Sequence, residues 1–334
     1  IAGSSCGMIG AAYFRELYLL KQKSKQINIY NRNYENNISK DILNAVAFSI
    51  ATNELFFGLQ RFTDGNHSYP KDRAYAFERQ LNENTSNLFE KELGDYTAPE
   101  KDAKIPLMIF SPSIVNDGRK LIVSSQPVSF LSQSINEKNI NGKTLIEAIE
   151  FCRFFENQAA LSVKFSSVLR MSATFPYISP VVTLPCEPVI EVMDAGMRDN
   201  FGFETTLKYI YTLRKWIEEN TSGIIILQIR DKHIERPIEP NPPKTLLQNL
   251  QRPVGSFYGN IFPVQDYNHS LMLQYASSAV KTKIDILNFE LKNEIPDNIS
   301  LSWHLTYYEK QKVLNSLFLP ENKNSVKQLL ELLR

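Results

Sequence analysis

The sequence is short of the residues that mark disulfide-rich and metal-binding proteins. Its 334 residues include only three cysteines, Cys6, Cys152 and Cys186, and no two of them form a C-x-x-C pair. So few and scattered thiols exclude a disulfide framework and a zinc site built on paired cysteines. We therefore expect no metal and no cofactor, and the low cysteine content fits a reducing compartment.

A long hydrophobic run is also missing. The most apolar stretch, residues 43–59, is interrupted by Asn44, Asn53 and Glu54. A membrane-spanning helix needs about 20 consecutive, mostly apolar residues. No transmembrane span is predicted within these residues, and an intracellular or membrane-associated location is favoured, although signals preceding Ile1 would not be visible.

Neither sign of charge is in excess. The chain carries 37 Lys and Arg against 36 Asp and Glu, which gives a formal net charge of +1. Proteins that bind nucleic acid usually carry a clear basic excess on one face. A nucleic-acid partner is therefore not expected.

What the sequence does contain is an alternation of helical and β-strand patterns. Apolar residues recur at helical spacing over 7–23, and a continuous β-branched run covers 189–193. Further helices are predicted at 41–59, from about 144, at 162–172, 203–220, 270–283 and 326–333. Further strands are predicted at 105–110, 121–124 and 224–229. This order predicts an α/β fold with a largely parallel sheet.

The patterning also suggests how the chain is divided. Residues 1–230 are predicted to form the core, with a loop at 24–39 and an insertion or lid at 60–103, where charges are many and periodic signals few. Four prolines, at 237, 240, 242 and 243, predict a linker or a long surface loop. Residues 231–334 are expected to be an extension of the same domain.

The most informative motif lies at the start of the chain. Gly3-Ser4-Ser5-Cys6-Gly7 matches G-x-S-x-G, a sharp turn from strand to helix that holds a serine at strained backbone angles. Gly3 and Gly7 let the chains pass one another, and Gly7 and Gly10 are expected to let the helix lie close to the strand. Ser5 is the predicted nucleophile, and the backbone N–H of Cys6 is a predicted oxyanion donor.

A serine hydroxyl needs a base to accept its proton, and Asp194 is the candidate. Asp194 ends the predicted strand at 189–193, is followed by the small pair Ala195-Gly196, and precedes Asp199-Asn200 at the start of a helix. A carboxylate at a strand end could bond Ser5 directly and act as a general base without histidine. The alternative is an ordinary strand-to-loop turn that Asn200 caps.

Histidine offers a second route to an activated serine. Ser5, Asp194 and one of three histidines would satisfy the order Ser, Asp, His of an α/β-hydrolase triad. The candidates are His233, His269 and His304; none lies in a glycine-rich turn or at a clear strand end.

Three segments together resemble the patatin-like phospholipases. The first is the elbow with its helix from Met8, the second is Asp194-Ala195-Gly196 with Asp199-Asn200, and the third is the stretch 171–176 followed by Pro180. The resemblance covers about residues 1–230. It implies a three-layer α/β/α fold with a mostly parallel central sheet, and a Ser5–Asp194 dyad that forms an acyl-enzyme without metal.

The resemblance further implies hydrolysis of acyl esters of phospholipids or related lipids, and hence peripheral contact with a membrane surface. Cys6 stands where the family usually has glycine. The apolar face of residues 41–58 could line an acyl pocket or pack in the core, and packing in the core is favoured. A patatin-like module that is catalytically silent and serves assembly or lipid binding is the alternative from another functional class.

The resemblance also carries an expectation about the start of the chain. In this family a glycine-rich loop upstream of the elbow supplies further oxyanion donors, and Ile1-Ala2 reads as the end of a buried strand. We therefore expect the 334 residues to be incomplete as an enzyme. An N-terminal segment of the same polypeptide is the predicted partner that supplies the loop.

Overall fold

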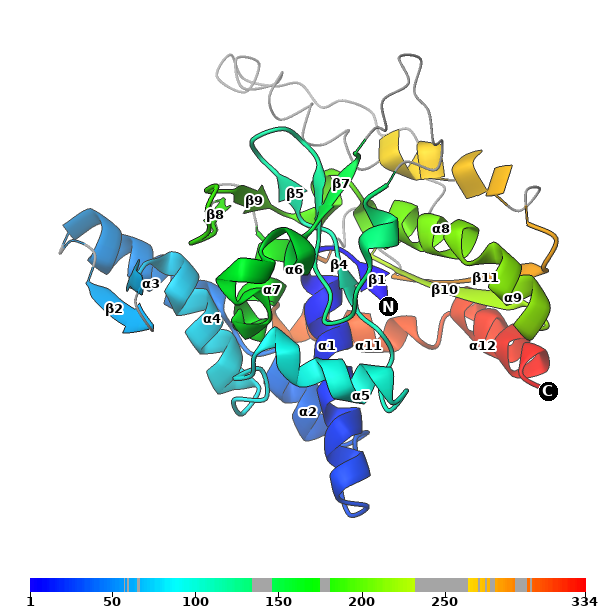
Figure 1. Ribbon diagram of the computed structural model, residues 1–334. Helices are drawn as coiled ribbons and strands as arrows, with labels where there is room; N and C mark the ends of the chain where they lie inside the picture. The colour runs from blue at the N-terminus through cyan, green and yellow to red at the C-terminus, as the bar shows by residue number, and fades with distance from the viewer. Residues whose placement is uncertain are drawn as a thin grey trace, which may run out of the picture. The chain divides into compact units, whose positions relative to one another are not determined.

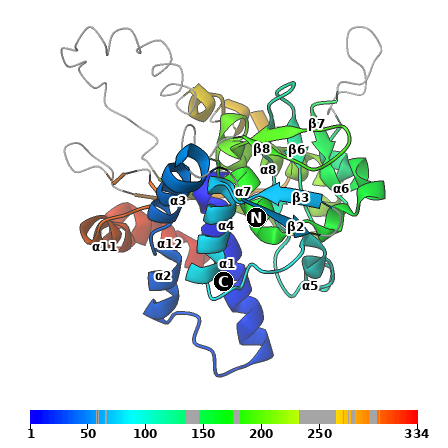
Figure 2. The same cartoon turned by 90° about the vertical axis from the view of Figure 1, so that its left-hand side faces the viewer.

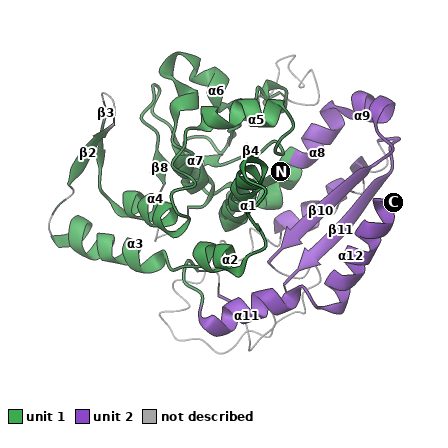
Figure 3. Cartoon of the chain, turned by 90° about the horizontal axis from the view of Figure 1, so that it is seen from below, with its two compact units in different colours: residues 1–205, 301–305 green, residues 206–300, 306–334 purple. Residues whose placement is uncertain are grey.

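The computed structural model describes residues 1–56, 58, 60–64, 67–133, 146–174, 181–231, 264–269, 271–273, 275–276, 280–291, 299–300 and 302–334. Helices and strands are mixed throughout, which confirms the predicted α/β character. The chain forms two compact units, drawn in green and purple in Figure 3. Unit 1 comprises residues 1–205 and 301–305, and unit 2 comprises residues 206–300 and 306–334.

Unit 1 begins with the strand and helix that the elbow motif predicts. Strand β1 (Ala2–Gly3) leads directly into helix α1 (Ser5–Lys23), and Figure 1 shows the two in blue. Beside β1 runs β4 (Ile109–Phe110), which pairs with it in parallel. The predicted apolar face of α1 is buried, with Met8, Ile9, Ala12, Tyr13 and Leu17 in the core of the unit. Burial of this face, rather than helix propensity alone, stabilises the helix that presents Ser5.

The largest sheet has five strands in the order β7-β6-β5-β9-β8. Its members are β5 (Ser113–Ile114), β6 (Lys120–Ile122), β7 (Ala148–Glu150), β8 (Val182–Thr183) and β9 (Glu191–Met193). Only β6 and β7 pair in parallel; the other three pairs are antiparallel. The described strands thus form small mixed sheets, and the predicted largely parallel central sheet within three layers is not confirmed.

Strand β7 corrects a sequence prediction. A helix was predicted from about residue 144 because Ile146 and Ile149 recur at a spacing that suits a helix. Residues 148–150 instead form a strand, in which Ile149 pairs with Leu121, and α6 (Phe151–Phe154) follows it. Short apolar runs suit a buried strand and a helix equally well, and the neighbouring strand decides between them here.

The segment after α1 is more ordered than its polar composition suggests. The predicted loop at 24–39 contains helix α2 (Arg32–Ile38), which Asn31 caps by accepting a hydrogen bond from the Asn33 N–H. The helix predicted at 41–59 consists of α3 (Leu43–Ser49) and a π-helical continuation, η1 (Ile50–Phe56). Figure 2 shows α3 beside α4 (Arg73–Asn84), against which it packs.

The region predicted as an insertion or lid divides into two parts. Its first part is a hairpin of β2 (Arg61–Asp64) and β3 (His67–Pro70). Its second part, residues 73–101, contains α4, η2 (Leu93–Tyr96) and α5 (Thr97–Lys101) and contributes buried side chains to the main core. These side chains are Phe77, Leu81, Phe89, Leu93 and Tyr96. Residues 73–96 therefore belong to the core of unit 1.

The remaining elements of unit 1 surround the predicted aspartate. Helix α7 (Phe165–Ser172) matches the prediction at 162–172 apart from its first turn. After β9 the chain forms two short 3-10 turns, η6 (Ala195–Met197) and η7 (Asn200–Gly202), and enters α8 (Phe203–Thr212). The helix predicted at 203–220 is real but breaks at Leu213, where α9 (Arg214–Asn220) begins.

Unit 2 is built around a second pair of parallel strands. Strand β10 (Ile224–Arg230) was predicted from the sequence. Strand β11 (Ile284–Glu290) was not predicted, and it pairs with all seven residues of β10. A helix was predicted from 270 to 283. Of the described residues before β11, those at 264–269, 271–273 and 275–276 are helical. Two helices follow, α11 (Tyr307–Ser316) and α12 (Pro320–Leu332). Among the described residues, no helix has the length and apolar character needed to cross a membrane.

Candidate functional site

Ser5 occupies the strained position that a nucleophile elbow requires. Its φ angle is 52°, in the left-handed region, although serine carries a Cβ that makes this region unfavourable. Ser4 before it is extended, with φ −131° and ψ 162°. A non-glycine residue held in this way at a strand-to-helix turn is typical of a functional site, where the surrounding structure fixes a conformation that costs about 1–3 kcal/mol.

The glycines of the elbow do not all have the role that the motif suggests. A Cβ on Gly3 would lie 3.0 Å from the Met8 Sδ, so a side chain at this position would crowd the first turn of α1. A Cβ on Gly7 or Gly10 would meet no described atom within 4 Å. The expectation that Gly7 and Gly10 bring the helix close to the strand is therefore wrong. Their small size leaves the solvent side of the helix open, since both are exposed.

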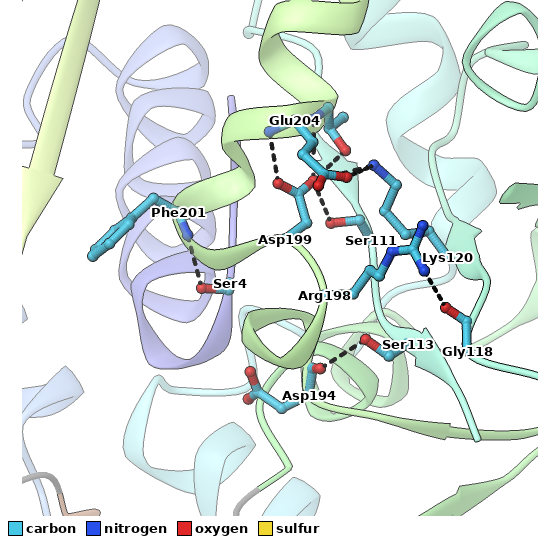
Figure 4. A network of polar contacts seen from close by, with 11 residues as sticks. Ser4, Ser111, Ser113, Gly118, Lys120, Asp194, Arg198, Asp199, Phe201 and Glu204 are labelled. Atoms are coloured by element: carbon cyan, nitrogen blue, oxygen red, sulfur yellow. Dashed lines mark hydrogen bonds and ion pairs between the residues drawn. The ribbon is translucent and has the colours of Figure 1, made fainter. Parts of the chain in front are cut away.

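Asp194 follows β9 directly, as predicted, and its main chain and side chain are both held. The Ser113 hydroxyl of β5 donates to the Asp194 carbonyl at 3.3 Å, and the Gly196 N–H donates to the carboxyl oxygen Oδ1 at 2.7 Å. Figure 4 shows the carboxyl projecting away from Ser113. Gly196 thus serves to orient the carboxyl, and the second oxygen, Oδ2, stays available for another partner.

Burial raises the pKa of Asp194 to about 7, because the carboxylate loses its contact with water. Hydrogen bonds from the Gly196 N–H and from the Ser5 hydroxyl offset part of this rise. Among the described residues Oδ2 has no hydrogen-bond partner of ordinary geometry, so the contact with Ser5 is a loose one. Such bonds are often long before substrate binds, and a carboxyl with a pKa near neutral pH is suited to accept and return a proton.

The loop after Asp194 is tied to the elbow by Ser4, the residue before Ser5. The Ser4 hydroxyl donates to Asn200 Oδ1 at 3.2 Å and accepts a hydrogen bond from the Phe201 N–H, also at 3.2 Å. Figure 4 shows the second of these bonds. Gly202, with φ +64°, lies so close to β1 that a Cβ would be 2.3 Å from the Gly3 nitrogen. These contacts explain how residues almost 200 positions apart are held together.

Asp199 is held by hydrogen bonds at the start of α8. Its carboxylate is fully buried and accepts hydrogen bonds from the Glu204 and Thr205 N–H groups at the start of α8, at 2.8 and 3.1 Å. The Ser111 hydroxyl donates to it at 3.3 Å, and the Lys120 ammonium lies 3.8 Å away. Asp199, not Asn200, therefore caps this helix, while Asn200 bonds Ser4.

Cys6 lies in the first turn of α1, where backbone N–H groups have no partner within the helix. No acidic residue lies in that turn of the helix, so its N-terminal partial positive charge is not neutralised from within. Cys6 as a whole residue keeps exposed surface, but its thiol is surrounded by protein. This loss of water contact, together with the nearby Asp194 charge, raises the pKa of the Cys6 thiol. The thiol also lies within hydrogen-bonding reach of Ser5 and of the Trp303 indole. The contact with Trp303 was not predicted from the sequence.

Of the three histidines considered for a triad, His304 has a partner other than Ser5 and Asp194. Nδ1 of His304 pairs with the Asp41 carboxylate, on the same unit as Ser5. His269 is buried in unit 2, and His233 lies outside the described residues. The Asp194 carboxyl, in contrast, lies within reach of the Ser5 hydroxyl.

The third segment of the resemblance is only partly described. Residues 171–174 end α7 with Met171, Ser172 and Ala173 buried, and residues 175–180 lie outside the described part of the chain. Within that part, no group of three or more His, Cys, Asp or Glu side chains is arranged to hold a metal ion. No protein-family model matches this chain, and no curated protein matches it either.

Proposed function

We propose that the protein is a serine acyl hydrolase in which Ser5 is the nucleophile and Asp194 is its general base. One observation carries the proposal: a serine held at φ 52° between a strand and a helix lies beside a buried carboxyl whose pKa is about 7. Strain of this kind and a raised carboxyl pKa are each found at catalytic sites, and here they meet at adjacent side chains.

The proposed reaction has two halves. In the first, Ser5 Oγ attacks the ester carbonyl carbon while Asp194 accepts the hydroxyl proton, and the carbonyl oxygen becomes an oxyanion. The Cys6 N–H and the start of α1 stabilise that charge. The tetrahedral intermediate then expels the alcohol, which takes the proton from Asp194 and leaves an acyl group on Ser5.

In the second half, Asp194 removes a proton from water, and the resulting hydroxide attacks the acyl-enzyme. Collapse of the second intermediate breaks the bond between the acyl carbon and Ser5 Oγ. The serine oxygen regains its proton from Asp194, and a carboxylic acid is released. The same carboxyl serves as base and then as acid in each half, which a pKa near neutral pH favours.

The substrate class proposed is the acyl ester of a phospholipid or a related lipid, reached at a membrane surface. Support comes from the patatin-like motifs around Ser5 and Asp194 and from the contact between the Ser5 hydroxyl and the Asp194 carboxyl. The proposal includes the family's three-layer α/β/α arrangement and a glycine-rich loop, upstream of the elbow, as the source of further oxyanion donors.

The test is covalent labelling of the full-length protein with a fluorophosphonate, which reacts with activated serines. We expect labelling of the wild type, none of Ser5→Ala, and a loss of at least about 100-fold in labelling rate for Asp194→Asn. Ser24→Ala, at the exposed end of α1, is the matched control and should label like the wild type. An unlabelled wild type would favour a catalytically silent lipid-binding scaffold instead.

A further inference from the structure

A short segment close to the C-terminus packs beside the nucleophile. Residues 302–305 belong to unit 1, although the chain on either side of them belongs to unit 2. The Trp303 carbonyl accepts a hydrogen bond from the Ile42 N–H at 3.2 Å, and its indole ring lies 4.8 Å from the ring of Phe77. The pair between His304 and Asp41 holds the next residue. The main chain and the ring of Trp303 are thus both held within unit 1.

The indole of Trp303 reaches the active serine's neighbour. Its N–H lies within hydrogen-bonding reach of the Cys6 thiol, and that thiol in turn lies close to Ser5 and to Asp194. Trp303 is only partly buried, so part of the residue is accessible. The ring is therefore separated from the proposed nucleophile by a single small side chain.

The surroundings of Trp303 are apolar, unlike those of Asp194. Phe77 is fully buried, and Ile42 is 7% exposed. Cys6 also lies near the Asp194 carboxyl, and Ser4, which precedes Ser5, makes polar contacts with Asn200. A hydrocarbon chain bound at Ser5 would be stabilised by burial against the indole, whereas a chain laid over the Asp194 carboxyl would cut that polar group off from water.

We infer that Trp303 forms part of the wall that receives the acyl chain of the substrate and so sets the preferred chain length. This inference rests on the proposed function, since it places the acyl group of the ester on Ser5. Trp303 acts by contact with the hydrocarbon and takes no part in the transfer of protons. It gives a role to a residue outside the region of the family resemblance.

The first experiment compares Trp303→Ala with Trp216→Ala in the full-length protein. The chain has two tryptophans, and Trp216 on α9 is 59% exposed, which makes it the matched control. For p-nitrophenyl acetate, butyrate and octanoate, Trp303→Ala should lower the ratio of kcat/KM for octanoate to that for acetate by at least about tenfold. Trp216→Ala should leave this ratio unchanged.

The second experiment measures binding and does not depend on turnover. Trp216→Phe leaves Trp303 as the one fluorescent tryptophan, and Trp303→Phe leaves Trp216. A dibrominated fatty acid quenches tryptophan only at close range, so it should quench Trp216→Phe strongly and Trp303→Phe hardly at all. The unbrominated acid serves as the control for indirect changes.

The outcomes separate the two proposals. Hydrolysis that depends on Ser5, with an unchanged ester ratio in Trp303→Ala or without selective quenching of Trp303, overturns this inference and leaves the proposed function intact. Selective quenching without hydrolysis overturns the proposed function but retains Trp303 as a contact for acyl chains. Equal quenching of both variants rejects the inference even if hydrolysis is absent.

Discussion

Gly202 lies against the backbone of Gly3 so closely that a Cβ on Gly202 would be 2.3 Å from the Gly3 nitrogen and 2.5 Å from the Ala2 carbonyl carbon. The strand before Ser5 and the turn after Asp194 are therefore in direct main-chain contact. Together with the hydrogen bonds of Ser4, this contact fixes how far Ser5 and Asp194 can move apart.

We predict that Gly202→Ala lowers the free energy of unfolding by about 3 kcal/mol or more, because a methyl group must displace backbone atoms. Gly118→Ala is the matched control: Gly118 also has positive φ, +75°, but a Cβ there would meet no described atom within 4 Å. Its cost should be about 1 kcal/mol, from the strained φ alone. Denaturant titration measures both, and equal costs would contradict the close contact.

The proposed base predicts a dependence of rate on pH. Asp194 must be ionised to accept the Ser5 proton, and burial raises its pKa to about 7. We expect kcat/KM to rise about tenfold per pH unit below this value and to level off above it. The measurement is ester hydrolysis from about pH 5 to about pH 9, with the product quantified by chromatography. A rise centred near pH 4, the usual range of an aspartate, would contradict the assignment.

Asp194 also predicts a dependence of stability on pH. Between its ordinary value of 3.8 and about 7, the folded protein keeps a proton on Asp194 that the unfolded chain has released. Stability is therefore lost as the pH rises through this window. Asp194→Asn removes the buried charge, so its stability relative to the wild type should be greater at about pH 8 than at about pH 4, by on the order of 1–4 kcal/mol. Denaturant titration at both pH values checks this, and equal differences would argue against a buried charge.

The histidines should be dispensable for the chemistry. We predict that His233→Ala, His269→Ala and His304→Ala each retain activity within about tenfold of the wild type, whereas Ser5→Ala loses several orders of magnitude. His304 pairs with Asp41, so its replacement should chiefly affect how Trp303 is held. Initial rates with a short-chain ester measure this. A loss in any histidine variant equal to that in Ser5→Ala would point to a Ser–Asp–His triad.

The local features of the site could be predicted from sequence because each depends on neighbours in the chain. Small residues around Ser5 with an amphipathic helix after them indicate the elbow, and an apolar run that ends in Asp194 indicates a strand end. Gly202, next to the start of α8, was not singled out from the sequence. It could have indicated the close approach to β1, since glycine before a helix often marks a close approach or a positive φ.

The features that were not predicted depend on pairing between distant segments. Residues 148–150 form a strand because β6 lies beside them, and β11 forms in parallel with β10. Likewise, Trp303 meets Cys6 only after the chain returns from unit 2 to unit 1. Periodicity within a window carries no information about such partners, so the mixed pairing of the five-stranded sheet was not foreseen either.

The left-handed backbone at Ser5 has a consequence for how this sequence can change over generations. Glycine adopts a φ of 52° without the steric cost that serine bears, so Ser5→Gly would relieve strain and abolish the hydroxyl in one step. Selection for folding alone would then favour the replacement of serine at this position. A lineage that keeps the serine does so against that selection. The residue found at position 5 in related sequences therefore tests whether the hydroxyl is retained for the proposed chemistry.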